Sequence, residues 1–141
     1  MRKLNKNIYN YIEYELFNYN SSKENLEILK LDSIYASADI DINSGIRSKY
    51  KKSNRVESSV ISILSNKQIS RLSSTIGAIN NALKMLDKVH YDFFRSYYIM
   101  RYGKLKICDQ LGLSERSFYN YKNRIVWAVA TEMGWMDKWK Q

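Results

Sequence analysis

The chain has 141 residues, and 45% of them are hydrophobic, which suffices for a folded core and excludes disorder throughout. It has no proline, five glycines and one cysteine, so long helices are favoured and an intramolecular disulfide is excluded. Lys and Arg outnumber Asp and Glu by 23 to 14, and the resulting net charge of +9 indicates a polyanionic partner, with nucleic acid favoured over an anionic membrane surface.

The sequence also lacks the signals of a membrane or exported protein. No stretch approaches the roughly 18 consecutive apolar residues that a transmembrane helix needs. The first twenty residues are basic, but they contain no apolar core of a signal peptide. We therefore expect a cytoplasmic protein that does not enter the membrane.

The first expected element is a helix over residues 3–34. Its apolar side chains recur at steps of three and four, or sums of these, and so form one stripe. The stripe consists of Ile8, Ile12, Leu16, Tyr19, Leu26 and Leu29. The run from Asn20 to Ser22 is a point where this helix could bend or end.

Residues 33–54 show no clear periodicity, and we expect a loop there. The second half of this loop is basic and contains no acidic residue. Its basic side chains include Arg47, Lys49, Lys51 and Lys52. Two interpretations stay open, because such a segment can be a solvated linker or a loop that contacts the DNA backbone.

Residues 56–89 show the most regular pattern and predict a long helix. Leu72, Ile76, Ile79, Leu83 and Leu86 follow one another at steps of 4, 3, 4 and 3, the narrow seam of a coiled coil. Such a seam cannot bury itself alone. It must pack on the first helix as an antiparallel hairpin, on a second copy as a homodimer, or on both, so we expect residues 1–88 to form a long-helix assembly region.

Residues 89–141 predict a compact domain of three short helices. The first runs to Gly103, which we expect to be its C-cap, and the second, KLKICDQL, stops at Gly112. The third begins at Ser114, a favourable N-cap residue with Glu115 in the first turn, and runs to Gly134. The expected fold is therefore all-α, with a helical hairpin or coiled coil followed by this domain.

The last two of these helices have the pattern of a helix-turn-helix. Gly112 can adopt the left-handed conformation of the turn, and Leu113 can plug it. The side chains expected to face the neighbouring helix come from both sides of the turn. They are Leu105, Ile107 or Cys108, and Leu111 on the first helix, and Phe118, Tyr121, Ile125 and Val129 on the second.

The opposite face of the second helix has the chemistry of a major-groove reader. Arg can bond guanine through two hydrogen bonds and Asn can do the same for adenine, while Lys, Arg and Ser hold phosphates. The candidate DNA-binding residues are Lys104, Lys106, Ser114, Glu115, Arg116, Ser117, Tyr119, Asn120, Lys122, Asn123 and Arg124, with Lys122 and Arg124 placed for phosphates. The alternative is a helical hairpin with an ordinary solvated face.

The segment KICDQLGLSERSFYNYKNRIVWAVATEMGW resembles the C-terminal part of the RinA/ArpU family of phage late-gene transcriptional activators, which is similar to the promoter-reading helix-turn-helix of sigma factors. YIEYELFNYNSSKENLEILKLDSIYAS and SGIRSKYKK resemble the RinA branch. The resemblance implies a DNA-binding activator of phage or prophage genes in a bacterial host, acting with RNA polymerase. It places Arg116, Ser117, Tyr119, Asn120 and Asn123 at the DNA. Phe118 departs from the Thr or Val common at its position.

Other functional classes have weaker support. Asp39, Asp41 and Asn43 imitate the start of a calcium loop, but the positions that need Gly and Glu hold Ser44 and Tyr50. One histidine and one cysteine, His90 and Cys108, fall short of a structural zinc site, and they make no convincing nucleophile–base pair. We therefore expect no metal, no cofactor and no enzymatic activity.

Three functions remain open from the sequence. The first is a sequence-specific transcriptional regulator that binds double-stranded DNA. The second is a packaging protein similar to a phage small terminase subunit, which would bind DNA as an oligomer of many copies. The third is an interaction module whose basic face meets an acidic protein. The number of copies in the assembly distinguishes the regulator from the packaging protein, and a DNA-binding measurement distinguishes both from the interaction module.

Overall fold

A computed structural model describes residues 3–42 and 51–136, and the side chains of residues 3–35 and 66–136. The described residues form helices and no strand, which confirms the all-α fold class. In chain order the elements are α1 (Lys6–Phe17), α2 (Tyr19–Ile42), α3 (Lys51–Met85), α4 (Lys88–Phe94), the π-helix η2 (Arg95–Ile99), α5 (Lys104–Leu111) and α6 (Glu115–Glu132). None of these helices is both long and apolar enough to cross a membrane.

The segment expected as one helix over residues 3–34 is two helices in the structure. The Asn5 side chain caps α1 by accepting a hydrogen bond of 2.9 Å from the backbone N–H of Asn7. At the other end, Asn18 leaves the helix and its side-chain amide donates to the Tyr14 carbonyl at 2.7 Å. The break therefore lies just before the expected one at Asn20, because Asn18 satisfies a terminal carbonyl.

The loop expected over residues 33–54 is wrong at both of its ends. Helix α2 continues to Ile42, and α3 already begins at Lys51. Neither flank contains proline or glycine, so the chain can stay helical without an amphipathic pattern. Lys51 and Lys52 are thus the first two residues of α3, whereas Arg47 and Lys49 lie outside the described residues.

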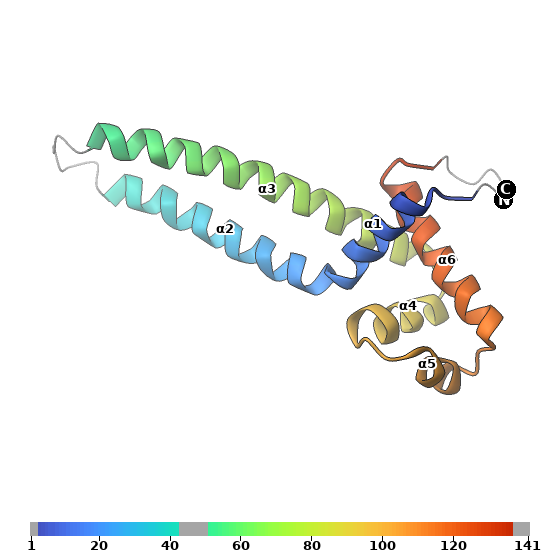
Figure 1. The fold of residues 1–141 in the computed structure, drawn as a ribbon. Coiled ribbons are helices and arrows are strands. Elements are labelled where there is room, and N and C mark those ends of the chain that lie inside the picture. The colour runs from blue at the N-terminus through green and yellow to red at the C-terminus, as the bar shows by residue number, and fades with distance from the viewer. Residues whose placement is uncertain (1–2, 43–50, 137–141) are drawn as a thin grey trace. The chain divides into compact units, whose positions relative to one another are not determined.

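The chain divides into two compact units. The first consists of Met1–Asn20 and Thr75–Gln141, and the second is Ser21–Ser74. The second unit contains nearly all of α2 and the larger part of α3, which run in opposite directions (Figure 1). The first unit contains α1, the end of α3 and all later helices.

The core of the first unit draws on segments far apart in the sequence. Its fully or nearly buried side chains include Ile12 and Leu16 of α1, Ile76, Ile79, Ala82 and Leu83 of α3, Phe93, Phe94 and Tyr98, Ile107 of α5, and Phe118, Ile125, Val126, Val129 and Ala130 of α6. Because α1 and the end of α3 bury apolar surface with the last helices, the compact units do not follow the expected boundary at residues 88 and 89.

This arrangement places most of the predicted coiled-coil seam inside the chain's own core. Ile76, Ile79 and Leu83 are buried in the first unit. Leu72 and Leu86 are half-buried, and Leu86 lies beyond the last residue of α3. The C-terminal part of the seam is therefore covered by residues of the same chain.

Aromatic contacts hold α4, η2 and α6 together. The Phe93 ring lies 5.1 Å from the ring of Phe118 and 5.7 Å from that of Tyr97. Phe118 also meets Tyr97 edge-on at 5.4 Å. Such pairs contribute about 0.5–1.5 kcal/mol each beyond their buried area. The bulk of Phe118 is thus accommodated by an aromatic core.

The expected C-cap at Gly103 is wrong. The preceding helix ends at Ile99, and Arg101 is the residue in the left-handed region, with φ of 57°. Gly103 is extended and precedes the first turn of α5. The Arg101 guanidinium donates to the Phe17 carbonyl at 3.4 Å and lies 5.7 Å from the Phe17 ring, so contacts with α1 offset the strain of a non-glycine residue at this φ.

Candidate nucleic-acid interface

The turn between α5 and α6 has the predicted geometry. Gly112 follows α5 in the left-handed conformation, with φ of 64° and ψ of 36°. The Leu113 N–H donates to the Cys108 carbonyl at 2.9 Å, which satisfies one of the last carbonyls of α5. A Cβ at Gly112 would meet no atom within 4 Å, so the requirement for glycine is conformational rather than steric.

The start of α6 is also as predicted. The Ser114 hydroxyl accepts a hydrogen bond of 3.1 Å from the Ser117 N–H and lies 3.0 Å from the Ser117 hydroxyl. Glu115 forms an exposed ion pair of 2.6 Å with Lys104 of α5, and this hydrogen bond raises the pKa of Lys104. All four side chains were predicted at the DNA; Ser114 and Ser117 cap α6, and the Lys104–Glu115 pair links α5 to α6 across the turn.

The expected inner face of α5 is partly wrong. Ile107 is fully buried and is the core residue of this helix, and Cys108 and Leu111 are half-buried. Leu105, expected to face α6, is 84% exposed. An eight-residue helix has little more than two turns, and here only Ile107 reaches the core completely. Lys106, predicted to contact DNA, is exposed on the same helix, and its ammonium lies 3.8 Å from the centroid of the Tyr102 ring.

The inner face of α6 is wider than predicted. Phe118, Ile125 and Val129 are buried as expected, and Tyr121 is half-buried against His90, with ring centroids 4.4 Å apart. Two further side chains on the same helix, Val126 and Ala130, are also buried. Helix α6 packs against α1 as well as against α4 and α5, so more of its surface is buried than the predicted stripe.

His90 lies in the first turn of α4. Burial, followed by the positive charge of Arg124, lowers its pKa, while Asp87 opposes this change. Its Nδ1 is buried and has no hydrogen-bond partner among the described residues. Within residues 3–42 and 51–136, no three or more His, Cys, Asp or Glu side chains form a cluster that could hold a metal ion.

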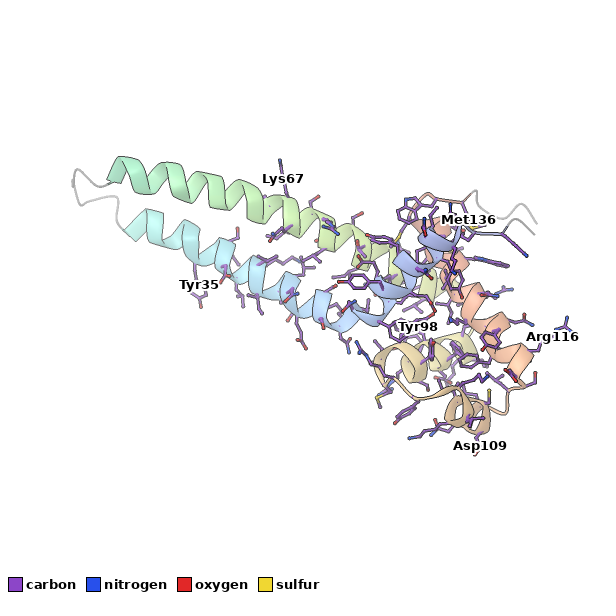
Figure 2. All side chains as sticks on the ribbon, in the orientation of Figure 1. Tyr35, Lys67, Tyr98, Asp109, Arg116 and Met136 are labelled. Carbon is purple, nitrogen blue, oxygen red and sulfur yellow. The ribbon has the colours of Figure 1, made fainter. Side chains whose placement is uncertain are left out.

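The outer face of α6 carries a row of polar side chains that we call the outer row: Arg116, Asn120 and Arg124. They are spaced four residues apart, so they stack along one side of the helix. All three are exposed, and none forms a hydrogen bond or an ion pair with another residue that the structure describes. Figure 2 shows Arg116 projecting outward near the beginning of α6. Tyr119, 45% exposed, lies beside this row.

Lys122 and Asn123, predicted to contact DNA, are held by α1. The Lys122 ammonium lies 3.1 Å from the Glu13 carboxylate, and both side chains are only 17% exposed. The Tyr9 hydroxyl donates to the Asn123 side-chain oxygen at 2.8 Å. Tyr98, labelled in Figure 2, donates to the same Glu13 oxygen at 3.2 Å.

Sequence reasoning missed this polar junction between α1 and α6. Tyr9 and Asn123 are 114 residues apart, and no local pattern links them. The available signal was weak: Glu13 directly follows Ile12, a residue of the predicted buried stripe. Burial, followed by the charge of Glu13, raises the pKa of Tyr9, so its hydroxyl keeps the proton that it donates.

Comparison of the chain with models of known protein families, with curated proteins and with solved structures gives no match.

Proposed function

We propose that this protein binds double-stranded DNA in a sequence-specific manner and reads the major groove with the first half of α6. The single observation that carries the proposal is the outer row, Arg116, Asn120 and Arg124, which is exposed and unpaired among the described residues. Because these side chains are exposed and form no hydrogen bond or ion pair with a described residue, they are available to a ligand. The net charge of +9 favours a polyanionic ligand.

The chemistry of the outer row fits base edges and phosphates. An arginine can donate two hydrogen bonds to guanine O6 and N7, and an asparagine can pair with adenine N6 and N7. In helix-turn-helix proteins the first turns of the second helix approach the bases. Arg116 and Asn120 occupy those turns, and Arg124 follows one turn later, where a phosphate contact is favoured.

In this proposal α5, the Gly112 turn and α6 form the helix-turn-helix of a three-helix domain with α4, and α2 and α3 form a helical hairpin. The resemblance to the RinA/ArpU activators extends the proposal to transcriptional regulation of phage or prophage genes together with RNA polymerase, in the bacterial cytoplasm and without catalysis. Support for this comes from the sequence segments around α6, and support for DNA binding comes from the outer row.

The proposal is tested with substitutions on the outer row of the full chain. Arg116→Ala and Asn120→Ala are each expected to weaken binding to the preferred duplex by about 1–3 kcal/mol, and to relax base choice at one position. Fluorescence anisotropy with single-base variants of that duplex measures both effects. Arg71→Ala and Asn81→Ala are matched controls, because both residues are exposed on α3. Unchanged base choice in both outer-row variants would show that α6 does not read DNA.

A further inference from the structure

Asn123 lies at the far end of the proposed recognition surface, seven residues after Arg116 on α6. Seven residues are close to two helical turns, so the two side chains share one side of the helix. Unlike Asn120, Asn123 is half-buried and already holds a hydrogen bond. That bond determines which end of its amide is left for a ligand.

The residue that holds Asn123 is itself fixed in position. Tyr9 lies on α1, and its ring is 5.8 Å from the Lys122 ammonium. Lys122 is paired with Glu13 one turn further along α1, and Glu13 also accepts the Tyr98 hydroxyl. These connected groups, of which Tyr98 is buried and the other three are half-buried, fix the side of α1 that faces α6.

The orientation of an asparagine amide determines which bases it can read. Reading adenine requires both ends at once, since the oxygen accepts from N6–H while the nitrogen donates to N7. Asn120 has both ends unpaired among the described residues. The oxygen of Asn123 is instead turned toward α1, where the Tyr9 hydroxyl donates to it at 2.8 Å. The end of Asn123 left for DNA is its amino group, which only donates.

We propose that Tyr9 is a specificity-determining residue of the DNA interface. By holding the Asn123 oxygen toward α1, it makes Asn123 a donor-only contact, which suits the acceptors guanine O6 and N7 or thymine O4 and removes the two-bond contact by which a free asparagine favours adenine. Tyr9 thus influences base choice through Asn123, without contacting the DNA itself. The inference rests on the proposed function, because it presupposes that α6 lies in the major groove.

The test compares the base preferences of full-length proteins by selection from a random duplex pool. Tyr9→Phe removes the hydroxyl and frees the Asn123 oxygen. At one position of the site, we expect the ratio of guanine or thymine to adenine to fall by about fivefold or more, the effect of roughly one base-edge hydrogen bond. Preferences at the other positions are expected to stay unchanged. Tyr14→Phe is the matched control on α1, because Tyr14 is 64% exposed.

A second variant tests the same contact without altering Tyr9. Asn123→Asp keeps an oxygen for the Tyr9 hydroxyl but replaces the donor end with another acceptor. It should transfer the preference at that position to cytosine, whose amino group donates. If the wild-type chain shows base preferences and both variants retain them, the inference fails and the proposed function stands. If the wild-type chain shows no base preference, the proposed function fails and the inference with it.

Discussion

Two basic residues of α6, two positions apart, are expected to act differently. Arg124 is exposed and forms no ion pair with a described residue, whereas Lys122 is paired with Glu13 at 3.1 Å. Each phosphate contact releases counterions and adds about 0.9 to the slope of log affinity against log salt. Arg124→Ala should therefore reduce this slope by about 1, and Lys122→Ala should leave it nearly unchanged.

Lys122→Ala should instead lower the free energy of unfolding by about 1–2 kcal/mol, because it leaves the largely buried Glu13 carboxylate without its positively charged partner. Salt titrations of DNA affinity and urea unfolding measure the two effects separately. Lys67→Ala, on an exposed position of α3 labelled in Figure 2, is the control for both. A loss of slope in Lys122→Ala equal to that in Arg124→Ala would show that Lys122 leaves Glu13 to bind phosphate.

For single residues of α6, the sequence predicts exposure to solvent better than it predicts hydrogen bonds and ion pairs with distant residues. Arg116 and Asn120 could be placed on an outer face, because the apolar stripe of the same helix defines that face. The engagement of Lys122 and Asn123 could not be predicted, since their partners lie more than a hundred residues earlier in the chain. Only the tertiary structure brings Tyr9 and Glu13 to α6.

At the scale of elements, the α5 turn depends on a glycine in the left-handed region. Gly112→Ala should lower the free energy of unfolding by about 1 kcal/mol through backbone strain, because its Cβ would meet open space. Gly77→Ala is the matched comparison, since Gly77 lies inside α3 and its Cβ would also meet open space. There alanine should stabilise by about 0.5–1 kcal/mol. Urea unfolding of both variants checks this. If both substitutions change the free energy of unfolding in the same direction, the different roles of Gly112 and Gly77 are contradicted.

The elements that the sequence predicted well are those with local signals. Gly112 and Ser114 mark the ends of α5 and α6 through backbone conformation and capping, which depend on neighbouring residues. The end of the helix before Gly103 was misplaced, because Arg101 adopts the left-handed conformation with help from α1. The end of α2 and the start of α3 lie in the segment expected as a loop. The sequence pattern missed them because hydrophobic periodicity indicates burial of one helix face, and a helix can form without such a buried face.

At the scale of the whole molecule, the all-α class followed from the absence of proline and the helical periodicity. The sequence did not predict which segments form the first unit, because this unit joins Met1–Asn20 with Thr75–Gln141. A fragment that starts at residue 89 would lack Ile12, Leu16 and Ile79 and would expose the core that they cover. The intact chain is therefore the appropriate material for binding experiments.

Sequence-specific DNA binding is tested by the relative affinity of the intact protein for two duplexes. One duplex carries the sequence enriched from a random pool, and the other has the same base composition in shuffled order. At physiological ionic strength we expect the selected duplex to bind at least about a thousandfold more tightly. We also expect log affinity to fall with log salt at a slope of roughly −4 to −7, which corresponds to about four to eight phosphate contacts. Equal affinity for the two duplexes, or an affinity independent of salt, would contradict sequence-specific DNA recognition by α6.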